Sequence, residues 1–210
     1  MSKDEKEQQE VNEFIFIPPS TESGISKVTG LYGEVSEENC RTLVNALYYF
    51  RDITLTELET NEAKEEDEEK KDPEPIECLV STEGGSVQDM FAVYDCVREI
   101  RKTCEIETFG VGKVMSAGVL LLASGTKGKR KVGANCRLML HAPSGGQFGS
   151  IKELQVDIKE VKWYQNQLVK SLAQETDLTE RKIRAIFRRK TDTYFDAKQA
   201  VEWGIADEIV

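Results

Sequence analysis

Short apolar runs alternate with amphipathic stretches along most of the 210-residue chain, and this alternation limits the folds open to it. The runs that read as strands are residues 14–17, 27–32, 76–81, 105–111, 131–132, 136–140 and 205–210. The stretches with helical spacing are residues 36–50, 87–101, 151–173, 179–189 and 196–203, with a further apolar helix opening at Ser116. Strands that alternate with helices favour a parallel sheet built of βαβ units, so we predict an α/β fold.

Two acidic tracts carry the net charge of −10. Residues 1–13 hold five acidic against two basic residues and residues 57–75 hold ten against three, which leaves 23 of each sign elsewhere. Such tracts cannot bury enough apolar surface to offset the entropy lost on ordering. We therefore predict an acidic arm with a short apolar segment over residues 1–26. Residues 27–210 are predicted as one domain with a disordered acidic insertion at about 54–75, tolerated at the surface.

The remaining composition excludes several classes of protein. The five cysteines are scattered and include no Cys-x-x-Cys pair, so neither a zinc site nor a disulfide framework is predicted. A nucleic-acid interface is not predicted, because the sequence contains no basic stripe with interleaved aromatic residues. The longest apolar stretch, residues 119–123, is too short to span a bilayer, and the first residues are too polar for a signal peptide. We expect a soluble cytoplasmic protein that uses no metal or cofactor and binds neither nucleic acid nor membrane.

His141 is the only histidine in the chain, so any Ser/His or Cys/His hydrolase mechanism must use it. It directly follows the predicted strand 136–140, and Ser116 opens an apolar helix that follows the predicted strand 105–111. A serine hydroxyl becomes a strong nucleophile only when a base removes its proton. Each residue taken alone is more often a packed core residue, but together, at the ends of neighbouring sheet elements, they predict a nucleophile and its base.

The pair Gly84-Gly85 forms a turn between a predicted strand and a helix that Ser86 can cap. Bare backbone N–H groups in such a turn can stabilise negative charge. We predict one oxyanion donor from this turn and a second from the N–H of Ala117 at the helix N-terminus. The alternative is a turn selected only for its geometry.

A series of motifs resembles the proteolytic subunit of the Clp protease family in both order and spacing. The motifs are Gly84-Gly85-Ser86-Val87 with Tyr94-Asp95; Gly112, Ser116 and Gly118; Gly125, Gly128 and Arg130; Met139, His141 and Pro143 with Gly145-Gly146; and Ala200-Val201-Glu202-Trp203-Gly204 with Asp207. The resemblance runs from about Leu31 to Val210, interrupted by the acidic insertion.

This resemblance implies a serine endopeptidase on a crotonase-like ββα superhelix with a projecting handle helix. Ser116 would be the nucleophile, His141 the general base and Asp192 the acid of a Ser-His-Asp triad, with Asp196 as the rival for the third position. The order Ser…His…Asp argues against α/β-hydrolase, chymotrypsin-like and subtilisin-like enzymes. By position in the family, the oxyanion donors are the backbone of Gly84 and Ala117.

The resemblance also implies where substrate binds and how subunits assemble. Peptide or unfolded protein would add as a strand along Gly85, Gly145 and Gly146. The helix 151–173 would be the handle that interlocks stacked, heptameric rings of identical subunits around a chamber. A long helix that carries Trp163 and Tyr164 agrees with a partner surface, and the alternative is a helix that packs only within its own subunit.

Several residues depart from the family pattern. The family turn reads Asn-Ser-Pro-Gly-Gly, whereas this chain has Glu83 in place of the proline, which brings a carboxylate close to the predicted oxyanion hole. Glu77 and Leu79 stand where the family has tyrosines in the docking cleft for an AAA+ unfoldase, which argues against docking of a standard unfoldase. Lys113 lies three residues before Ser116 and offers a Ser-Lys dyad as a weaker alternative.

Two other functions remain open from the sequence. The first alternative to the peptidase is a non-catalytic ring subunit or scaffold that assembles with an active relative. The second is a crotonase-fold enzyme acting on acyl-CoA. An intact triad counts against the scaffold, while Glu83 keeps it open. An acyl-CoA enzyme would use oxyanion donors without a serine nucleophile, so Ser116→Ala would leave its activity standing.

Overall fold

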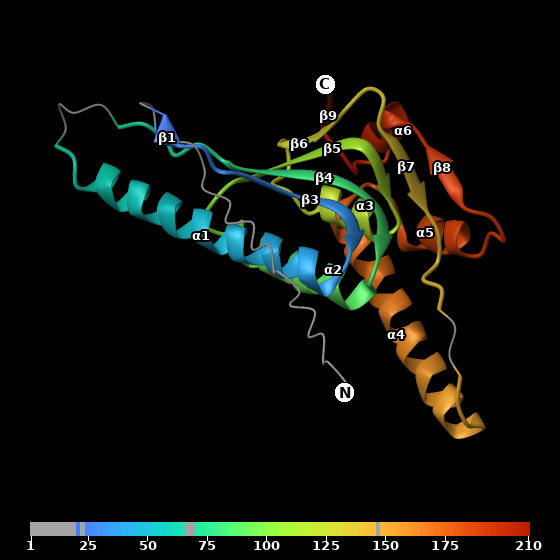
Figure 1. The fold of residues 1–210 in the computed structure, drawn as a ribbon. Coiled ribbons are helices and arrows are strands. Elements are labelled where there is room, and N and C mark those ends of the chain that lie inside the picture. Colours follow the sequence, from blue (N-terminus) through green and yellow to red (C-terminus); the bar gives the residue numbers. More distant parts are fainter. Residues whose placement is uncertain (1–19, 22–23, 66–69, 146–147) are drawn as a thin grey trace, which may run out of the picture.

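A parallel sheet forms the centre of the computed structural model, which describes residues 20–21, 24–65, 70–145 and 148–210 (Figure 1). Its strand order is β3-β4-β5-β6-β9, with β7 beside β5 and β8 beside β7. All of these pairings are parallel except β7–β8. The strands are β3 (Val28–Val35), β4 (Ile76–Gly85), β5 (Ile106–Met115), β6 (Arg130–Val132), β7 (Arg137–Leu140), β8 (Thr193–Phe195) and β9 (Glu208–Ile209). The predicted α/β fold with a parallel sheet is therefore confirmed.

Side-chain caps define where most of the helices begin. The helices are α1 (Glu37–Glu62), α2 (Val87–Ile100), α3 (Ala117–Ala123), α4 (Ile151–Glu175), α5 (Glu180–Phe187) and α6 (Ala197–Glu202), and a short hairpin, β1 (Ser20–Thr21) with β2 (Gly24–Ile25), precedes the sheet. Every one of these helices except α3 begins after a residue whose side chain accepts a hydrogen bond from a backbone N–H of the first turn. Within the described part of the chain, no helix is both long and apolar enough to cross a membrane.

The core lies between the sheet and the helices, and α3 is its centre. Every residue of α3 is buried, which explains why this helix is apolar on all sides. It contacts β4 and β5 on one side and α2 and α4 on the other. Alternate residues of β4 are buried, as expected for a strand packed on one face. The residue before α3, Ser116, is therefore attached to the most deeply buried helix of the molecule.

Helix α1 is longer than the sequence indicates. It continues to Glu62, well beyond the predicted end at residue 50, so residues 54–62 are helical and not disordered as expected. The reason is a long-range contact, because the buried amine of Lys27 donates to Thr54 Oγ1 at 3.0 Å and to Glu57 Oε2 at 2.7 Å. Residues 70–75 have no helix or strand, and residues 66–69 lie outside the described residues.

The boundaries of other elements shift by smaller amounts. Strand β5 runs through Gly112, at φ +65°, as far as Met115, so it leads directly to Ser116 instead of ending at residue 111. The predicted strand over residues 14–17 and most of the predicted arm lie outside the described residues.

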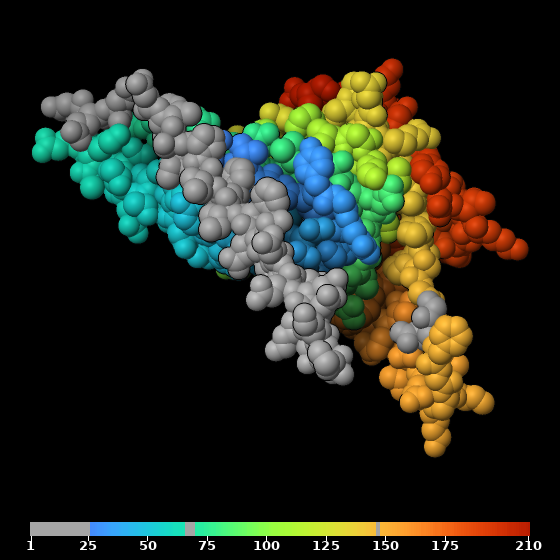
Figure 2. Space-filling view, in the orientation of Figure 1, coloured from blue at the N-terminus to red at the C-terminus, as the bar shows by residue number. Residues whose placement is uncertain are grey.

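Helix α4 is divided between the body and solvent. Leu168, Val169 and Leu172 in its C-terminal half are buried against the core. Its N-terminal half projects away from the body at the lower right of Figures 1 and 2. Large apolar side chains are exposed on this helix, namely those of Ile151, Val156, Ile158 and Trp163. A capping box between Ser150 and Glu153 stabilises the projecting end.

Candidate active site

Ser116 lies in a sharp junction between β5 and α3. Its φ of +55° makes it the single non-glycine residue with a positive φ in the described part of the chain. Its backbone N–H donates to the carbonyl of Met139 at 2.8 Å, which holds the junction against β7. It occupies the N-cap position of α3 but makes no side-chain cap hydrogen bond. The hydroxyl is therefore free for another partner, and strain of this kind is concentrated at functional sites.

His141 meets Ser116 because their strands are neighbours. Parallel pairing aligns Met115 of β5 with Met139 of β7, so Ser116 and His141 both follow the carboxyl ends of adjacent strands. His141 Nε2 lies 2.8 Å from Ser116 Oγ, within hydrogen-bond distance. The structure thus brings together the two residues that the sequence predicts as nucleophile and base.

Asp192 lies on the other side of the imidazole. The antiparallel pairing of Leu140 with Thr193 puts the residue after Leu140 opposite the residue before Thr193. Asp192 Oδ1 is 3.6 Å from His141 Nδ1, which is longer than a normal hydrogen bond. The rival carboxylate of Asp196 instead caps α6 by accepting the N–H of Gln199 at 2.9 Å. Of the two candidates, Asp192 is therefore the one beside the histidine.

Gly84 packs against the nucleophile so closely that only glycine fits. Its φ is +103°, and a Cβ atom there would lie 2.6 Å from the Cβ of Ser116. Its N–H donates to Oγ1 of the buried Thr82 at 2.9 Å, so this predicted oxyanion donor already has a partner. The other predicted donor, the N–H of Ala117, belongs to the first turn of α3 and has no acceptor within the helix.

A pocket of about 390 Å³ opens beside Ser116. It is lined by Glu83, Gly85, Ser86, Val87, Met90, Ser116, Ala117, His141, Pro143, Ser144, Val161, Tyr164 and Leu168. The lining combines apolar side chains from α2 and α4, here called the apolar wall, with polar groups that include Ser116 and His141. Predominantly apolar pockets with a few polar groups are typical of ligand sites.

The predicted substrate-binding glycines have different positions relative to this pocket. Gly85 lines it. Gly145 is exposed and is not among the lining residues, although its neighbours Pro143 and Ser144 are. Gly146 lies outside the described residues.

Glu83 is at the rim of the pocket, where its side chain pairs with Lys113. Lys113 Nζ lies 2.7 Å from Glu83 Oε1, and both side chains are substantially exposed. This hydrogen bond lowers the pKa of the Glu83 carboxyl, so Glu83 is ionised at neutral pH. Because its amine is bonded to Glu83, Lys113 does not act as the base of Ser116 in this arrangement.

Sequence reasoning missed two parts of the site. The hydroxyl of Thr82 that holds the Gly84 N–H gives no recognisable signal, because a threonine in a buried strand is common. The wall formed by Val161, Tyr164 and Leu168 follows a helical spacing that is visible in the sequence. What the spacing does not reveal is that this face of α4 meets the serine.

Comparisons with known proteins give the same assignment as the site. The sequence model of the Clp protease family matches residues 36–210. The chain is 35% identical over 144 residues to "ATP-dependent Clp protease proteolytic subunit 1" of Bifidobacterium longum (strain NCC 2705), an alignment that covers 68% of this chain and 60% of that protein. It is 33% identical over 141 residues to "ATP-dependent Clp protease proteolytic subunit 2" of Chlamydia pneumoniae, covering 67% and 66% of the two chains.

The matched part of the chain spans less than two thirds of the length of these relatives. The family match nevertheless extends from the cap of α1 to the last residue. It includes β4 to β9, the pocket and the contact between Ser116 and His141, and of the sheet it leaves out only β3. On the strength of this match, the chain belongs to the Clp protease family.

Proposed function

We propose that this protein is a serine endopeptidase that cleaves peptides or unfolded proteins. The observation that carries the proposal is the 2.8 Å contact between Ser116 Oγ and His141 Nε2, made by a serine held at positive φ at a helix N-terminus. Membership of the Clp protease family supports the same reaction.

In the proposed mechanism, His141 takes the proton of Ser116 as Oγ attacks the scissile carbonyl. The imidazolium then protonates the leaving amine, and a water molecule activated by His141 hydrolyses the acyl-enzyme. Developing charge on the carbonyl oxygen is stabilised by the N–H of Ala117 and by the dipole of α3. The N–H of Gly84 contributes as the second donor by sharing or leaving its bond to Thr82.

Asp192 completes the triad by accepting a hydrogen bond from the Nδ1–H of His141, which fixes the tautomer and stabilises the imidazolium. The separation of 3.6 Å must shorten for this role. Catalytic hydrogen bonds of this kind commonly tighten when substrate binds. Because Asp192 is about half exposed, burial by substrate or by a neighbouring subunit would strengthen its interaction with the imidazolium.

Substrate is proposed to lie as an extended strand between the Gly84-Gly85 turn and the segment that contains Gly145 and Gly146. One substrate side chain would occupy the apolar wall of the pocket. Support comes from Gly85 on one side and from Pro143 and Ser144 on the other, all of which line the pocket.

Assembly into stacked rings is proposed from α4. Its projecting half exposes Ile151, Val156 and Ile158, an apolar surface that a second copy would cover as the handle of a crotonase-like superhelix. The names of the relatives include the term ATP-dependent, which makes an AAA+ unfoldase a candidate partner. Glu77 and Leu79 in β4 argue against the docking mode of the family.

Labelling with a fluorophosphonate probe tests the proposal. The wild type is compared with Ser116→Ala and His141→Ala, and with Ser144→Ala as a matched control. Ser144 is a serine that lines the same pocket, but it is Ser116 whose hydroxyl lies at hydrogen-bond distance from His141 Nε2. We expect labelling that depends on Ser116 and His141 but survives in the control. The contrary result is wild-type protein that native mass spectrometry shows to be an assembled ring but that is not labelled. This result would rule out the peptidase and favour the scaffold function.

The scaffold function is retained as the second candidate because of one observation. The 3.6 Å gap between His141 and Asp192 leaves the base without its orienting hydrogen bond. A ring subunit that supports an active relative requires no such bond. Such a subunit would assemble but remain unlabelled under all conditions.

A further inference from the structure

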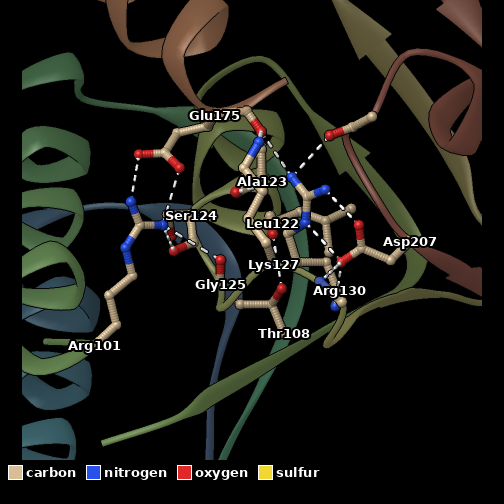
Figure 3. A network of polar contacts seen from close by, with 12 residues as sticks. Arg101, Thr108, Leu122, Ala123, Ser124, Gly125, Lys127, Arg130, Glu175 and Asp207 are labelled. Carbon is tan, nitrogen blue, oxygen red and sulfur yellow. Dashed lines mark hydrogen bonds and ion pairs between the residues drawn. The ribbon is translucent and has the colours of Figure 1, made fainter. Parts of the chain in front are cut away.

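A buried carboxylate lies at the end of α4, remote from the candidate active site. Glu175 is 1% exposed, and its two oxygens accept hydrogen bonds from Arg101 at 2.9 and 2.8 Å (Figure 3). The hydroxyl of Tyr94 donates to the same carboxylate at 2.9 Å. A buried ion pair with this geometry is costly to break, because removing one partner leaves an uncompensated charge in the interior.

This cluster joins the C-terminal ends of three helices. Arg101 follows α2, and its guanidinium also donates to the carbonyl of Ser124, the C-cap of α3, at 2.7 Å. Glu175 is the last residue of α4, and its carbonyl accepts hydrogen bonds from Arg130 at 2.7 Å and from Lys127 at 3.1 Å (Figure 3). Arg130 is fixed in turn by an ion pair with Asp207.

Residues elsewhere in the same three helices line the pocket. Helix α2 contributes Val87 and Met90, α3 begins directly after Ser116, and α4 contributes its apolar wall. The Arg101–Glu175 ion pair therefore ties the end of α2 to the end of α4, and both of these helices contact the nucleophile's helix α3.

A chain of aromatic rings connects the cluster to the pocket. The ring of Tyr94 packs edge-on against Phe91, with centroids 6.3 Å apart. Phe91 stacks on Tyr164 at 6.2 Å with an interplanar angle of 24°. Tyr164 lines the pocket. Contacts between packed rings favour particular orientations, so this chain of contacts offers a physical route from Tyr94 to Tyr164.

We propose that Glu175, Arg101 and Tyr94 are positioning residues that hold Tyr164 and the spacing of α2 and α4, and thereby select the size of the substrate side chain bound in the pocket. The proposal rests on the peptidase function above. None of these residues touches the reacting atoms. They act through the aromatic contacts and the helix ends.

The test compares peptides that differ only in the residue before the scissile bond, with Ala, Leu or Phe at that position and a fluorogenic leaving group. The variant Tyr94→Phe keeps the ring and removes the hydroxyl that bonds Glu175. Phe91→Leu breaks the ring contact without touching the buried charge. Tyr49→Phe is the matched control, since Tyr49 is exposed on α1.

We expect the wild type to prefer Leu or Phe, and this preference over Ala in kcat/KM to fall about tenfold in Tyr94→Phe and Phe91→Leu. Labelling of Ser116 and turnover of the Ala peptide should stay within about twofold of wild type, since the nucleophile and base are not displaced. The control should retain the full preference. Substitution of a residue that only stabilises the fold would lower kcat/KM for all three peptides in the same proportion.

Two results overturn the inference and are distinguishable from each other. In the first, the wild type and both variants are labelled and have the same ratio of kcat/KM for the Leu or Phe peptide to that for the Ala peptide. The positioning role is then wrong and the peptidase function is retained. If assembled wild-type protein is neither labelled nor active on any of the peptides, the peptidase function fails and the inference fails with it.

Discussion

At the scale of single residues, Gly84 packs directly against the nucleophile Ser116. The glycine combines a φ of +103° with a position at which a Cβ atom would lie 2.6 Å from the Cβ of the serine and 3.2 Å from the carbonyl of Met115. Both the backbone conformation and the space therefore require glycine. Neither neighbour can move easily, because Ser116 is itself held at positive φ.

We predict that Gly84→Ala displaces Ser116 and lowers the rate of fluorophosphonate labelling by about a hundredfold, on the order of losing an oxyanion-hole donor. Gly33→Ala is the matched control, since Gly33 has a similar φ of +85° but open space around a new Cβ atom. It should show the strain of about 1 kcal/mol without the loss of labelling. Equal losses in the two variants would contradict the steric explanation.

The charges at the rim allow a second prediction at this scale. Glu83→Gln removes a carboxylate near the predicted oxyanion hole and leaves the positive charge of Lys113 in place, so labelling should become about threefold faster at low ionic strength. Lys113→Gln should slow it by a similar factor. High salt should abolish both effects because the pair is exposed. Changes that persist in high salt would point to altered packing instead of charge.

At the scale of elements, the sequence predicted those parts of the site that follow from strand order. Ser116 and His141 meet because each follows a strand, and the two strands are neighbours in a parallel sheet. Asp192 was assigned from the resemblance alone, and the β7–β8 pairing beside His141 could not be read from periodicity. The bond from Gly84 to Thr82 also depends on the detailed path of a single turn.

The second half of α1 was not predictable for a related reason. Its residues are too polar to indicate a helix, and what stabilises them is Lys27, which lies far away in sequence. Local propensity is weak compared with tertiary contacts of this kind.

We predict that Lys27→Ala leaves the buried hydroxyl of Thr54 without this donor, and lowers the free energy of unfolding by about 1–3 kcal/mol. Hydrogen exchange should become faster over residues 54–62 and remain slow over residues 37–50, which pack on the core. Lys102→Ala serves as the control, because its ion pair with Glu99 is exposed and should contribute less than about 1 kcal/mol. Uniformly faster exchange along α1 would mean that the two halves unfold together.

At the scale of the whole molecule, the N-terminal half of α4 extends from the body (Figure 2). This half carries apolar side chains in solvent, whereas the charges outside the two acidic tracts are balanced. Isolated exposed apolar residues are common, but several on one projecting helix are typical of an interaction surface. The same helix carries the pocket wall at its other end. The proposed assembly and the geometry of the site are therefore connected through α4.

The last prediction follows from this connection. Ile158→Glu puts a charge on the exposed apolar surface of α4, so native mass spectrometry should detect a shift from rings to smaller species. Lys159→Glu introduces the same side chain at the neighbouring exposed position and should leave assembly intact. If assembly also closes the gap between His141 and Asp192, the Ile158→Glu subunit should label at least about tenfold more slowly than the ring. Dispersed subunits that label at the full rate would show that the triad closes within one chain, and that the projecting half of α4 serves assembly alone.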